Sequence, residues 1–318
     1  MTAPNMRGVL LMTYGSPASL DREDIRAYLA RVRGGRDPDA ELVDEFTRRY
    51  RVIGGSPLIA ITRDQAAGLE ATLGWPVEVG MRFSEPSIEA GLAALADRGV
   101  RDAIAIVLSP QYSPLLMSGY ATAIETAATA LGAGAPTAIV AGAWHEQPAF
   151  VAALAARVRD ALDLLPPDER DGARILMTAH SLPKRVADTE PAYLDQLRAT
   201  AEAVATAAGL APDRWSFCWQ SAGHEPGEWM KPDFADLMPL IAETPARSVL
   251  VCPVQFLADH LEILYDVDVG ARDQAAVRGV AFRRIASLNA DPGLIAALAA
   301  VARETTRASR TMAEPARR

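Results

Sequence analysis

The sequence predicts an α/β fold in which parallel sheets are covered by helices. Short apolar or β-branched runs alternate with Ala-, Leu- and Arg-rich stretches of helical period. The pattern also repeats: the first strand ends in LLMTYGSP and the fifth in ILMTAHSLP, and later strands run into the loops of IAIVLSPQYSP and VLVCPVQFLADH. We therefore expect two similar halves whose strand ends meet at a shared cleft, where open α/β sheets bind ligands.

The expected elements follow from these runs. Strands are expected at residues 7–13, 76–82, 102–109, 137–141, 173–178, 215–219, 247–253 and 279–283. Helices are expected at residues 20–33, 39–50, 57–73, 86–98, 117–132, 147–164, 190–208, 233–242, 258–268 and 291–308. The linker is expected near 142–150 or in the polar stretch at 166–172. This gives an N-terminal domain over 1–142 and a C-terminal domain over 143–289, with the segment 290–318 available to pack on the first domain.

Composition excludes several classes of function. The chain has 318 residues, of which 50% are hydrophobic, enough to build the core of a two-domain protein. A formal net charge of -8 and the lack of any Lys/Arg run argue against a nucleic-acid partner. No stretch approaches the roughly 20 apolar residues of a spanning helix, and the N-terminal run lacks a signal-type cleavage region. We therefore expect a cytoplasmic protein without an integral membrane segment.

The cysteines and the helical periodicity add two expectations. Cys218 and Cys252 are the only cysteines, too few for a disulfide framework or an all-cysteine iron–sulfur cluster. Both lie in apolar strand-like runs, which favours buried free thiols. No coiled-coil heptad pattern is present, so a monomer is expected.

His180 follows a buried strand and precedes the proline-containing turn of MTAHSLP. Its imidazole is expected at the carboxyl end of the strand, where a neutral ring binds iron or accepts a proton near neutral pH. A single histidine is more often structural, and the chain has only four. The role of His180 therefore depends on what lies beside it.

The segment FLADHLEILYDVD is more informative. If it is helical, its period puts Asp259, Glu262 and Asp266 on one face and apolar side chains on the opposite face. His260 then points away from the acidic face and is interpreted as a structural or supporting residue. A solvated acidic face near a helix N-terminus is an equally good interpretation. Glu262 facing His180 would instead form an open site for a divalent metal.

Residues suited to a flat ligand with carboxylates lie in the first half. Tyr14, in the turn after the first strand, either anchors that turn or contacts a planar ligand. The turn YGSP has neither the GxGxxG fingerprint nor the Walker lysine, so nucleotide binding has no support. Guanidinium groups suit carboxylates, although each arginine taken singly is more often a surface residue. The arginines near Gly-rich turns are Arg33, Arg36, Arg48, Arg49 and Arg51.

Two loops carry large apolar side chains. SPQYSPLLMSGY provides Tyr112, Met117 and Tyr120, which suit an apolar wall. WQSAGHEPGEWMKP provides Trp219, Trp229 and His224. The sequence does not separate lining a cleft from pinning the loop for these last three.

Together, these segments resemble the ferrochelatase family. The resemblance rests on TYGSP, IGGSPL, SPQYS, AHSLP, WQSAG and FLADHLEILYD, which occur in the family's order. Any one of them is weak, but their joint occurrence is highly specific. The resemblance extends from MTYGSP through the DHLEILYD segment and beyond, and it is strongest to the soluble coproporphyrin III ferrochelatases of bacteria. It implies two similar Rossmann-like domains with a porphyrin cleft between them.

The resemblance also implies roles for individual residues. His180 and Glu262 would be the iron-binding and catalytic pair. Tyr14 matches the tyrosine that faces the metal from the other side in the coproporphyrin-specific branch. The implied porphyrin and propionate contacts are Arg33, Arg49, Tyr50, Ser56 and Tyr120. The implied activity is insertion of Fe²⁺, as a substrate, into coproporphyrin III in haem biosynthesis, with no organic cofactor and no iron–sulfur cluster.

Two positions depart from the family pattern. Gly270 stands where some relatives carry a further Glu, so an outer metal-relay site is expected to be weak or absent. Phe83 stands where some relatives have histidine, which argues against an additional metal contact there. Neither departure affects His180 or Glu262.

Four alternatives stay open at this point. A protoporphyrin IX ferrochelatase differs only in how many propionates its cleft tolerates. Cobalt or nickel chelatases share the architecture but typically offer more histidines than this chain has. A haem carrier or sensor would use Tyr14 or His180 as a permanent axial ligand. A Rossmann-type nucleotide enzyme is the weakest alternative, because the glycine fingerprint is missing.

Overall fold

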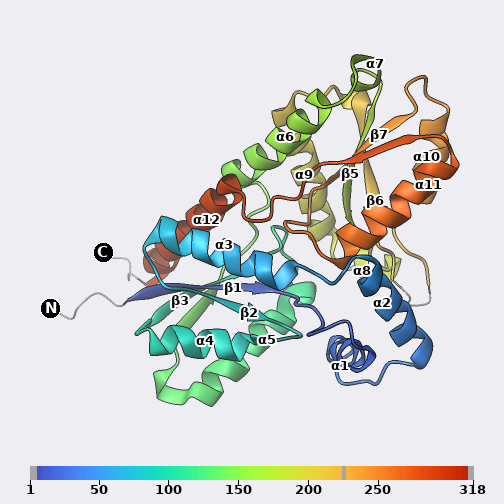
Figure 1. Cartoon of the computed structure of the whole chain (residues 1–318). Coiled ribbons are helices and arrows are strands. Elements are labelled where there is room, and N and C mark those ends of the chain that lie inside the picture. Colours follow the sequence, from blue (N-terminus) through green and yellow to red (C-terminus); the bar gives the residue numbers. More distant parts are fainter. Residues whose placement is uncertain (1–5, 224–226, 314–318) are drawn as a thin grey trace. The chain divides into compact units, whose positions relative to one another are not determined.

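The computed structural model describes residues 6–223 and 227–313, and it divides into two compact units (Figure 1). Unit 1 contains the chain up to Trp144 and again from Asn289 onward, and unit 2 contains His145–Leu288. The first crossing between the units lies inside the expected linker at 142–150. His224 falls outside the described residues.

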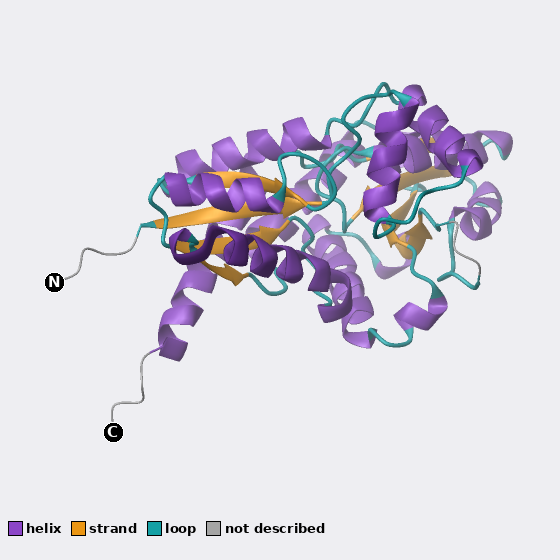
Figure 2. Cartoon of the chain, turned by 90° about the horizontal axis from the view of Figure 1, so that it is seen from below, coloured by secondary structure: helices purple, strands orange, loops and turns teal. Residues whose placement is uncertain are grey.

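Unit 1 is built on a four-stranded parallel sheet of order β2-β1-β3-β4. Its elements are β1 (Arg7–Thr13), α1 (Arg22–Val32), α2 (Ala40–Val52), α3 (Leu58–Leu73), β2 (Val77–Met81), α4 (Ile88–Asp97), β3 (Asp102–Val107), α5 (Pro114–Leu131), η1 (Gly132–Gly134), β4 (Thr137–Val140) and α12 (Pro292–Ala313). Leu11 pairs in register with Val79 on one side and Ile106 on the other. Helices cover both faces of this sheet (Figure 2), which explains why β1 is apolar at successive positions rather than at alternate ones.

Unit 2 repeats this plan with a four-stranded parallel sheet of order β6-β5-β7-β8. Its elements are α6 (Pro148–Asp163), α7 (Pro167–Arg170), β5 (Arg174–His180), α8 (Lys184–Ala187), α9 (Pro191–Ala208), η2 (Pro212–Arg214), β6 (Trp215–Gln220), α10 (Phe234–Ala242), β7 (Ser248–Pro253), the π-helix η3 (Glu262–Ala271), α11 (Arg272–Val277) and β8 (Ala281–Arg284). Ile175, Met177 and Cys252 are completely buried in this sheet. The predicted fold class of two parallel sheets flanked by helices is confirmed.

The strand order positions the functional loops. In each unit the chain first builds to one side of its first strand and then returns to the other side, so the order reverses between β1 and β3 and between β5 and β7. Ligands of open parallel sheets bind outside the carboxyl ends of the strands at such a reversal. The turn after β1 holds Tyr14, and β5 ends at His180. The expected placement of both residues at strand ends is therefore confirmed.

Two helices begin three or more residues away from their expected starts. Helix α5 begins at Pro114 rather than at 117, because the Ser113 hydroxyl accepts a hydrogen bond from the amide of Leu116 (3.1 Å) and proline fits the first helical turn. The helix expected over 258–268 begins only after His260, and its first ten residues, Glu262–Ala271, form a π-helix. The α-helical spacing used for Asp259 and His260 was therefore wrong.

The last helix belongs to unit 1. Helix α12 packs on α3, where Gly68 lies against Ile295: a Cβ at Gly68 would stand 3.2 Å from the Ile295 side chain. The Gln65 amide also donates to the carbonyl oxygen of Asn289 (2.8 Å). Among residues 6–223 and 227–313, no helix combines the length and apolarity needed to cross a membrane.

Candidate active site

His180 and Glu262 approach each other at the carboxyl end of the unit 2 sheet. The Nε2 atom of His180 lies 3.8 Å from Oε2 of Glu262, and the two side chains are 30% and 35% exposed. The Nδ1 atom of His180 contacts the carbonyl oxygen of Ser181. Because a carbonyl only accepts, Nδ1 carries a proton, and Nε2 is the ring atom that faces Glu262. A proton or a divalent cation between the two atoms would satisfy both.

Glu262 is held at the start of η3 by a buried amide. The Thr178 hydroxyl donates to Oε1 of Gln220 (2.6 Å), and both residues are buried. Nε2 of Gln220 then donates to the carbonyl oxygen of Glu262 (3.4 Å). Gln220 therefore connects β5, β6 and the first turn of η3, and it fixes the backbone from which the Glu262 carboxylate projects.

His260, interpreted from the sequence as a structural or supporting residue, is a third member of this site. Its Nε2 atom also lies 3.8 Å from Oε2 of Glu262, as close as that of His180. Its Nδ1 donates to the carbonyl oxygen of Ala258 (3.0 Å), and its ring packs against Phe256 with centroids 4.7 Å apart. The prediction that His260 turns away from Glu262 was wrong because His260 precedes the helix, where helical spacing does not apply.

The two imidazoles keep Glu262 ionised. Burial of the carboxyl group opposes its ionisation, but interaction with the imidazolium forms of His180 and His260 outweighs that effect and lowers the pKa of Glu262 to about 2. The carboxylate is therefore charged at every pH at which the protein would work. Within the described part of the chain, no group of three or more His, Cys, Asp or Glu has its donor atoms gathered around one metal position.

Two other acidic residues of this segment, Asp259 and Asp268, bind an arginine. Arg284 binds Asp268 through Nε (2.7 Å) and Nη2 (2.8 Å), and its Nη2 also donates to Asp259 (3.3 Å). The Ser287 hydroxyl donates to the same Asp259 oxygen (2.7 Å). Arg284 is only 12% exposed. The expected acidic face containing Asp259 does not form, because the guanidinium of Arg284 takes up that carboxylate.

In unit 1, Tyr14 belongs to a stack of rings and one guanidinium. The Tyr14 ring meets Phe83 edge-on, with centroids 4.6 Å apart. The Arg82 guanidinium lies over both Phe83 (4.8 Å) and Tyr120 (5.3 Å). Tyr14 remains 43% exposed, whereas Tyr120 is 6% exposed. Burial raises the pKa of Tyr120 well above its usual range, so its hydroxyl stays protonated.

The turn that carries Tyr14 is fixed by its neighbours. The Tyr28 hydroxyl donates to the carbonyl oxygen of Gly15 (3.1 Å), and the Phe83 amide donates to that of Tyr14 (3.1 Å). Gly15 has φ +96°, and a Cβ there would overlap the Ser84 hydroxyl, so only glycine fits. The exposed part of Tyr14 is therefore presented by a rigid turn, as a ligand-contacting ring requires.

The other predicted porphyrin contacts lie on and around α1 and α2. Arg33 is exposed at the end of α1, and Arg49 is partly buried, with its Nε donating to Glu45 (2.7 Å). Tyr50 is 4% exposed and forms part of the core of unit 1. The Ser56 hydroxyl accepts from the amide of Leu58 (3.4 Å) at the start of α3. The predicted roles of these residues as porphyrin contacts stay predictions.

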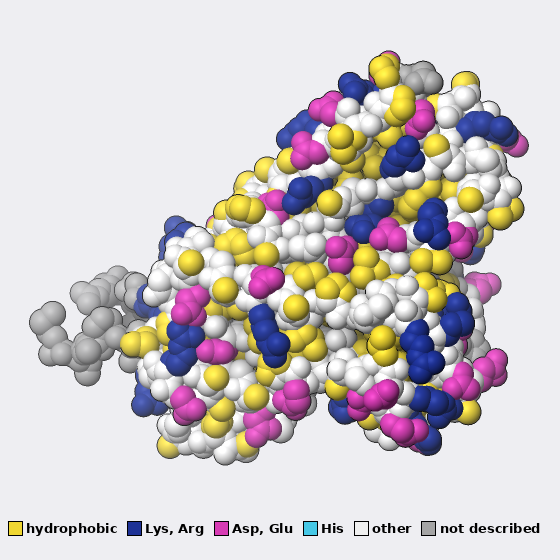
Figure 3. Space-filling view, in the orientation of Figure 1, with side chains coloured by type: hydrophobic (Ala, Val, Ile, Leu, Met, Phe, Trp, Pro, Cys, Tyr) yellow, Lys and Arg dark blue, Asp and Glu magenta, His cyan; other side chains and the backbone are white. Residues whose placement is uncertain are grey.

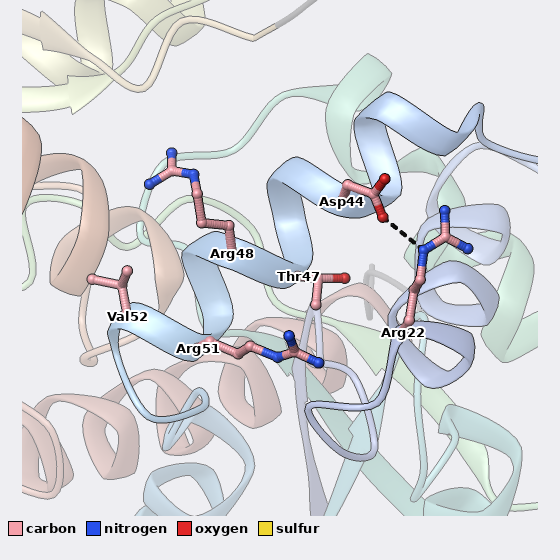
Figure 4. Close-up of a pocket in the computed structure, with 6 residues that line it drawn as sticks. All are labelled: Arg22, Asp44, Thr47, Arg48, Arg51 and Val52. Atoms are coloured by element: carbon pink, nitrogen blue, oxygen red, sulfur yellow. Dashed lines mark hydrogen bonds and ion pairs between the residues drawn. The ribbon is translucent and has the colours of Figure 1, made fainter.

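A separate hollow of about 490 Å³ opens beside α1 and α2 (Figure 4). It is lined by Arg22, Asp44, Thr47, Arg48, Arg51 and Val52. Arg22 donates to Asp44 across it (2.6 Å), and Arg48 is paired with Glu45 (2.8 Å). Much of its positive charge is thus balanced within the protein. The face of the molecule in Figure 3 shows the same intermixing of acidic and basic side chains, in place of one basic tract.

The loop aromatics divide between core and surface roles. Trp219 is 3% exposed and packs edge-on against Phe217 with centroids 5.0 Å apart, so it stabilises unit 2. The backbone of Trp229 forms an isolated bridge with Pro183, which pins its loop to the turn after His180. Met117 is also buried, and Tyr112 packs against the same core.

Sequence reasoning missed two residues that shape the sites. Gln220 donates to the backbone of Glu262, and Arg82 lies over Tyr120. Gln220 lies within the motif WQSAG, so the motif carried a signal for it. Arg82 adjoins Phe83, which was considered only as a substitution for histidine.

Three kinds of similarity to known proteins agree with this arrangement. A family model described as Ferrochelatase matches residues 6–306. The chain is 39% identical over 300 residues to a protein named ferrochelatase from Deinococcus radiodurans, covering 92% of this chain and 94% of that protein. It is 37% identical to a coproporphyrin III ferrochelatase from Geobacillus kaustophilus (92% and 94% covered) and 35% identical to one from Bacillus subtilis (92% and 96%).

Solved structures share the fold at much lower identity. SirB from Bacillus subtilis, determined with Fe³⁺, has a TM-score of 0.60 and 13% identity, covering 96% of this chain and 98% of that chain. CbiX, described as the terminal enzyme for biosynthesis of sirohaem in denitrifying bacteria, has a TM-score of 0.52 and 18% identity, covering 95% and 99%. These similarities support the two-unit α/β architecture.

Proposed function

The chain belongs to the ferrochelatase family, whose members are porphyrin metal chelatases, and we propose that it inserts Fe²⁺ into coproporphyrin III to give Fe-coproporphyrin in haem biosynthesis. The observation that carries the proposal is the open pair of His180 and Glu262 at the carboxyl end of a parallel sheet. The choice of coproporphyrin is supported by relatives of that name at 34–37% identity over at least 92% of this chain.

The reaction requires a metal to enter and two protons to leave. Fe²⁺ replaces the two pyrrole N–H protons, so the products are the iron porphyrin and two H⁺. An ion held about 2.1 Å from both Nε2 of His180 and Oε2 of Glu262, a usual metal–ligand distance, fits the 3.8 Å between those atoms. As the iron moves on to the ring, the Nε2 lone pair of His180 accepts one pyrrole proton, Glu262 stabilises the resulting imidazolium, and the second proton passes to water at the exposed side of the pair.

Unit 1 supplies groups suited to the porphyrin itself. The exposed ring of Tyr14 offers a flat contact, and Arg33 offers a guanidinium for a propionate. Binding energy from propionates remote from the metal can be used to bend the ring and expose its nitrogen lone pairs. We propose that Tyr14, Arg33, Arg49 and Ser56 act in this way, and that Tyr50 and Tyr120 support them from the core.

The test is multiple-turnover metal insertion under anaerobic conditions. The purified protein is incubated with Fe²⁺ and either coproporphyrin III or protoporphyrin IX, and the loss of porphyrin fluorescence is followed. Rapid turnover with coproporphyrin III alone is the expected result. Preference for protoporphyrin IX would overturn the choice of substrate. Stoichiometric binding without turnover for both would overturn the enzymatic proposal in favour of a haem carrier or sensor.

A further inference from the structure

The end of β5 loses its neighbour on one side just before His180. Strand β7 pairs with β5 only as far as Thr178 opposite Pro253, and the last bond on this side is the Val254 amide donating to the Thr178 carbonyl (2.9 Å). In a parallel sheet, backbone groups two residues apart face the same neighbouring strand. The amide of His180 therefore points to the β7 side of β5, where β7 has already ended. No backbone carbonyl of β7 is available to accept its hydrogen bond.

A side chain takes the place of the missing strand. Oε1 of Gln255, two residues beyond β7, accepts the hydrogen bond from the His180 amide at 2.8 Å. On the other side, the Ser181 amide still donates to the backbone carbonyl of Gln220 (2.7 Å). The backbone at His180 and Ser181 is thus held from both sides, by β6 through its main chain and by the β7 loop through one amide side chain.

The orientation of the Gln255 amide is itself fixed. Its Nε2 donates to the hydroxyl of Tyr193 at 2.6 Å, and Tyr193, on α9, is 2% exposed. A carboxamide can turn over and exchange its oxygen for its nitrogen, which would present a donor to the His180 amide. The backbone amide of His180 can only donate, so it requires the carboxamide oxygen on its side. The Tyr193 hydroxyl then accepts the hydrogen bond from the carboxamide nitrogen and holds the side chain in place.

We propose that Gln255 is a positioning residue for His180, with Tyr193 as its anchor. The His180 ring contacts the carbonyl of the adjacent Ser181 through Nδ1, so movement of this backbone moves the ring. Its Nε2 lies at 3.8 Å from Glu262, where a small displacement changes the geometry of any ion held between them. Groups that orient a metal-binding histidine through one intermediate contribute strongly to activity although they never touch the metal. The proposal rests on the proposed function of His180.

The experiment compares Gln255→Leu and Tyr193→Phe with the unaltered protein. Gln255→Leu keeps the size of the side chain and removes both hydrogen bonds, so kcat for iron insertion is expected to fall about tenfold while KM for the porphyrin stays unchanged. Tyr193→Phe removes only the anchor, and kcat is expected to fall roughly threefold, the effect of one ordinary hydrogen bond. Backbone amide exchange provides the second readout: protection at His180 should be lost in the same order, while protection at Ser181 persists.

The control is Gln274→Leu, the same chemical change in α11. The side-chain oxygen of Gln274 is buried and has no hydrogen-bond partner among the described residues, so kcat and the exchange at His180 should both remain unchanged. The positioning role would be overturned if Gln255→Leu lost the exchange protection at His180 but kept full kcat. It would also be overturned if the variant kept that protection. If Gln255→Leu fails to fold, Tyr193→Phe decides by the same two readouts. An inactive unaltered protein would instead refute the proposed function, since the exchange measurement does not depend on activity.

Discussion

The carboxyl end of the unit 2 sheet is held by amides and carboxylates, whereas the corresponding end of the unit 1 sheet is held by aromatic rings and a guanidinium. In unit 2, Gln220 and Gln255 fix the backbones of Glu262 and His180 through directional hydrogen bonds. In unit 1, Phe83 meets Tyr14 edge-on and Arg82 lies over Phe83 and Tyr120, while backbone hydrogen bonds hold the turn that carries Tyr14. Both sheets have the same strand order, so the order determines where the residues lie and the loops determine their chemistry. Directional hydrogen bonds fix the position of single atoms, whereas packed rings present a flat apolar surface.

The largest effect should come from substitutions in unit 2 that lower turnover without changing porphyrin binding. His180→Ala and Glu262→Gln are each expected to lower turnover by at least roughly 10²-fold, the usual contribution of an acid–base residue, while the dissociation constant for porphyrin changes little. Anaerobic turnover and porphyrin fluorescence titration measure the two quantities. His145→Ala, also in unit 2, is the control and should retain full turnover. Weakened porphyrin binding with normal turnover would contradict this prediction, because it would place these two residues in porphyrin binding and not in turnover.

The next effect concerns the carboxylates beside the unit 2 site. Arg284→Gln leaves Asp259 and Asp268 without their shared guanidinium, and it is expected to destabilise the protein by about 2 kcal/mol, less than for a completely buried pair because both carboxylates are partly exposed. Urea unfolding followed by circular dichroism measures this. The control, Arg272→Gln, breaks an exposed pair with Asp273 and should change stability by less than about 0.5 kcal/mol. Equal effects would show that Arg284 is an ordinary surface arginine.

A smaller effect is expected in unit 1, from a substitution that changes the contact of Arg82 with Tyr120 without weakening the fold. Gly119→Ala places a methyl group where the Arg82 guanidinium now lies over Tyr120. That end of the side chain is flexible, so the fold should not be weakened, and alanine favours helix α5 over glycine by about 1 kcal/mol. The fold loses a cation–π contact worth about 1 kcal/mol, which the helix gain offsets, so the melting temperature should change little while the displaced guanidinium disturbs the rings and lowers porphyrin affinity.

The matched change for this test is Gly134→Ala, at a glycine whose added Cβ would meet no atom within 4 Å. It should leave both porphyrin affinity and melting temperature as they are. Unchanged affinity in Gly119→Ala would mean that the rings of unit 1 do not contribute to binding through Arg82.

The smallest effect is a pH dependence of stability that arises from Glu45 in unit 1. Hydrogen bonds from Arg48 and Arg49 lower the pKa of Glu45 from 4.5 to about 2. The stabilisation is therefore present above about pH 5 and is lost as the pH falls toward 2. After screening by solvent, Glu45→Gln is expected to cost about 1 kcal/mol or less near neutral pH. The difference between the two proteins in urea unfolding should vanish near the lower pH; a constant difference would contradict the pairing.

Strand positions and strand ends were predictable because they depend on local patterns. Apolar runs of strand length mark the strands of both sheets, and a histidine that follows such a run must lie at a strand end. His180 was placed in this way, and Glu262 was placed on the acidic side of its segment. These patterns left structural roles open for both residues, and it was the resemblance to the ferrochelatase motifs that made them a pair.

The contacts that hold these residues were not predictable from local patterns. Gln255 and Tyr193 are separated by 62 residues and Thr178 and Gln220 by 42, and nothing in either stretch marks the partner. Asp259 was misplaced because the helix begins only after His260 and then widens into a π-helix, whose side chains do not follow the 3.6-residue period. The pairing of Asp259 with Arg284 depends on a strand that comes later in the chain.

The return of α12 to unit 1 has a consequence for protein synthesis. Unit 2 is one uninterrupted segment that is synthesised between the two parts of unit 1. Helix α3 is made before unit 2, whereas the helix that packs over Gly68, residues 292–313, is made after it. The surface of α3 that α12 covers is therefore uncovered while the whole of unit 2 is being made, and a nascent chain arrested before α12 would present that surface to chaperones.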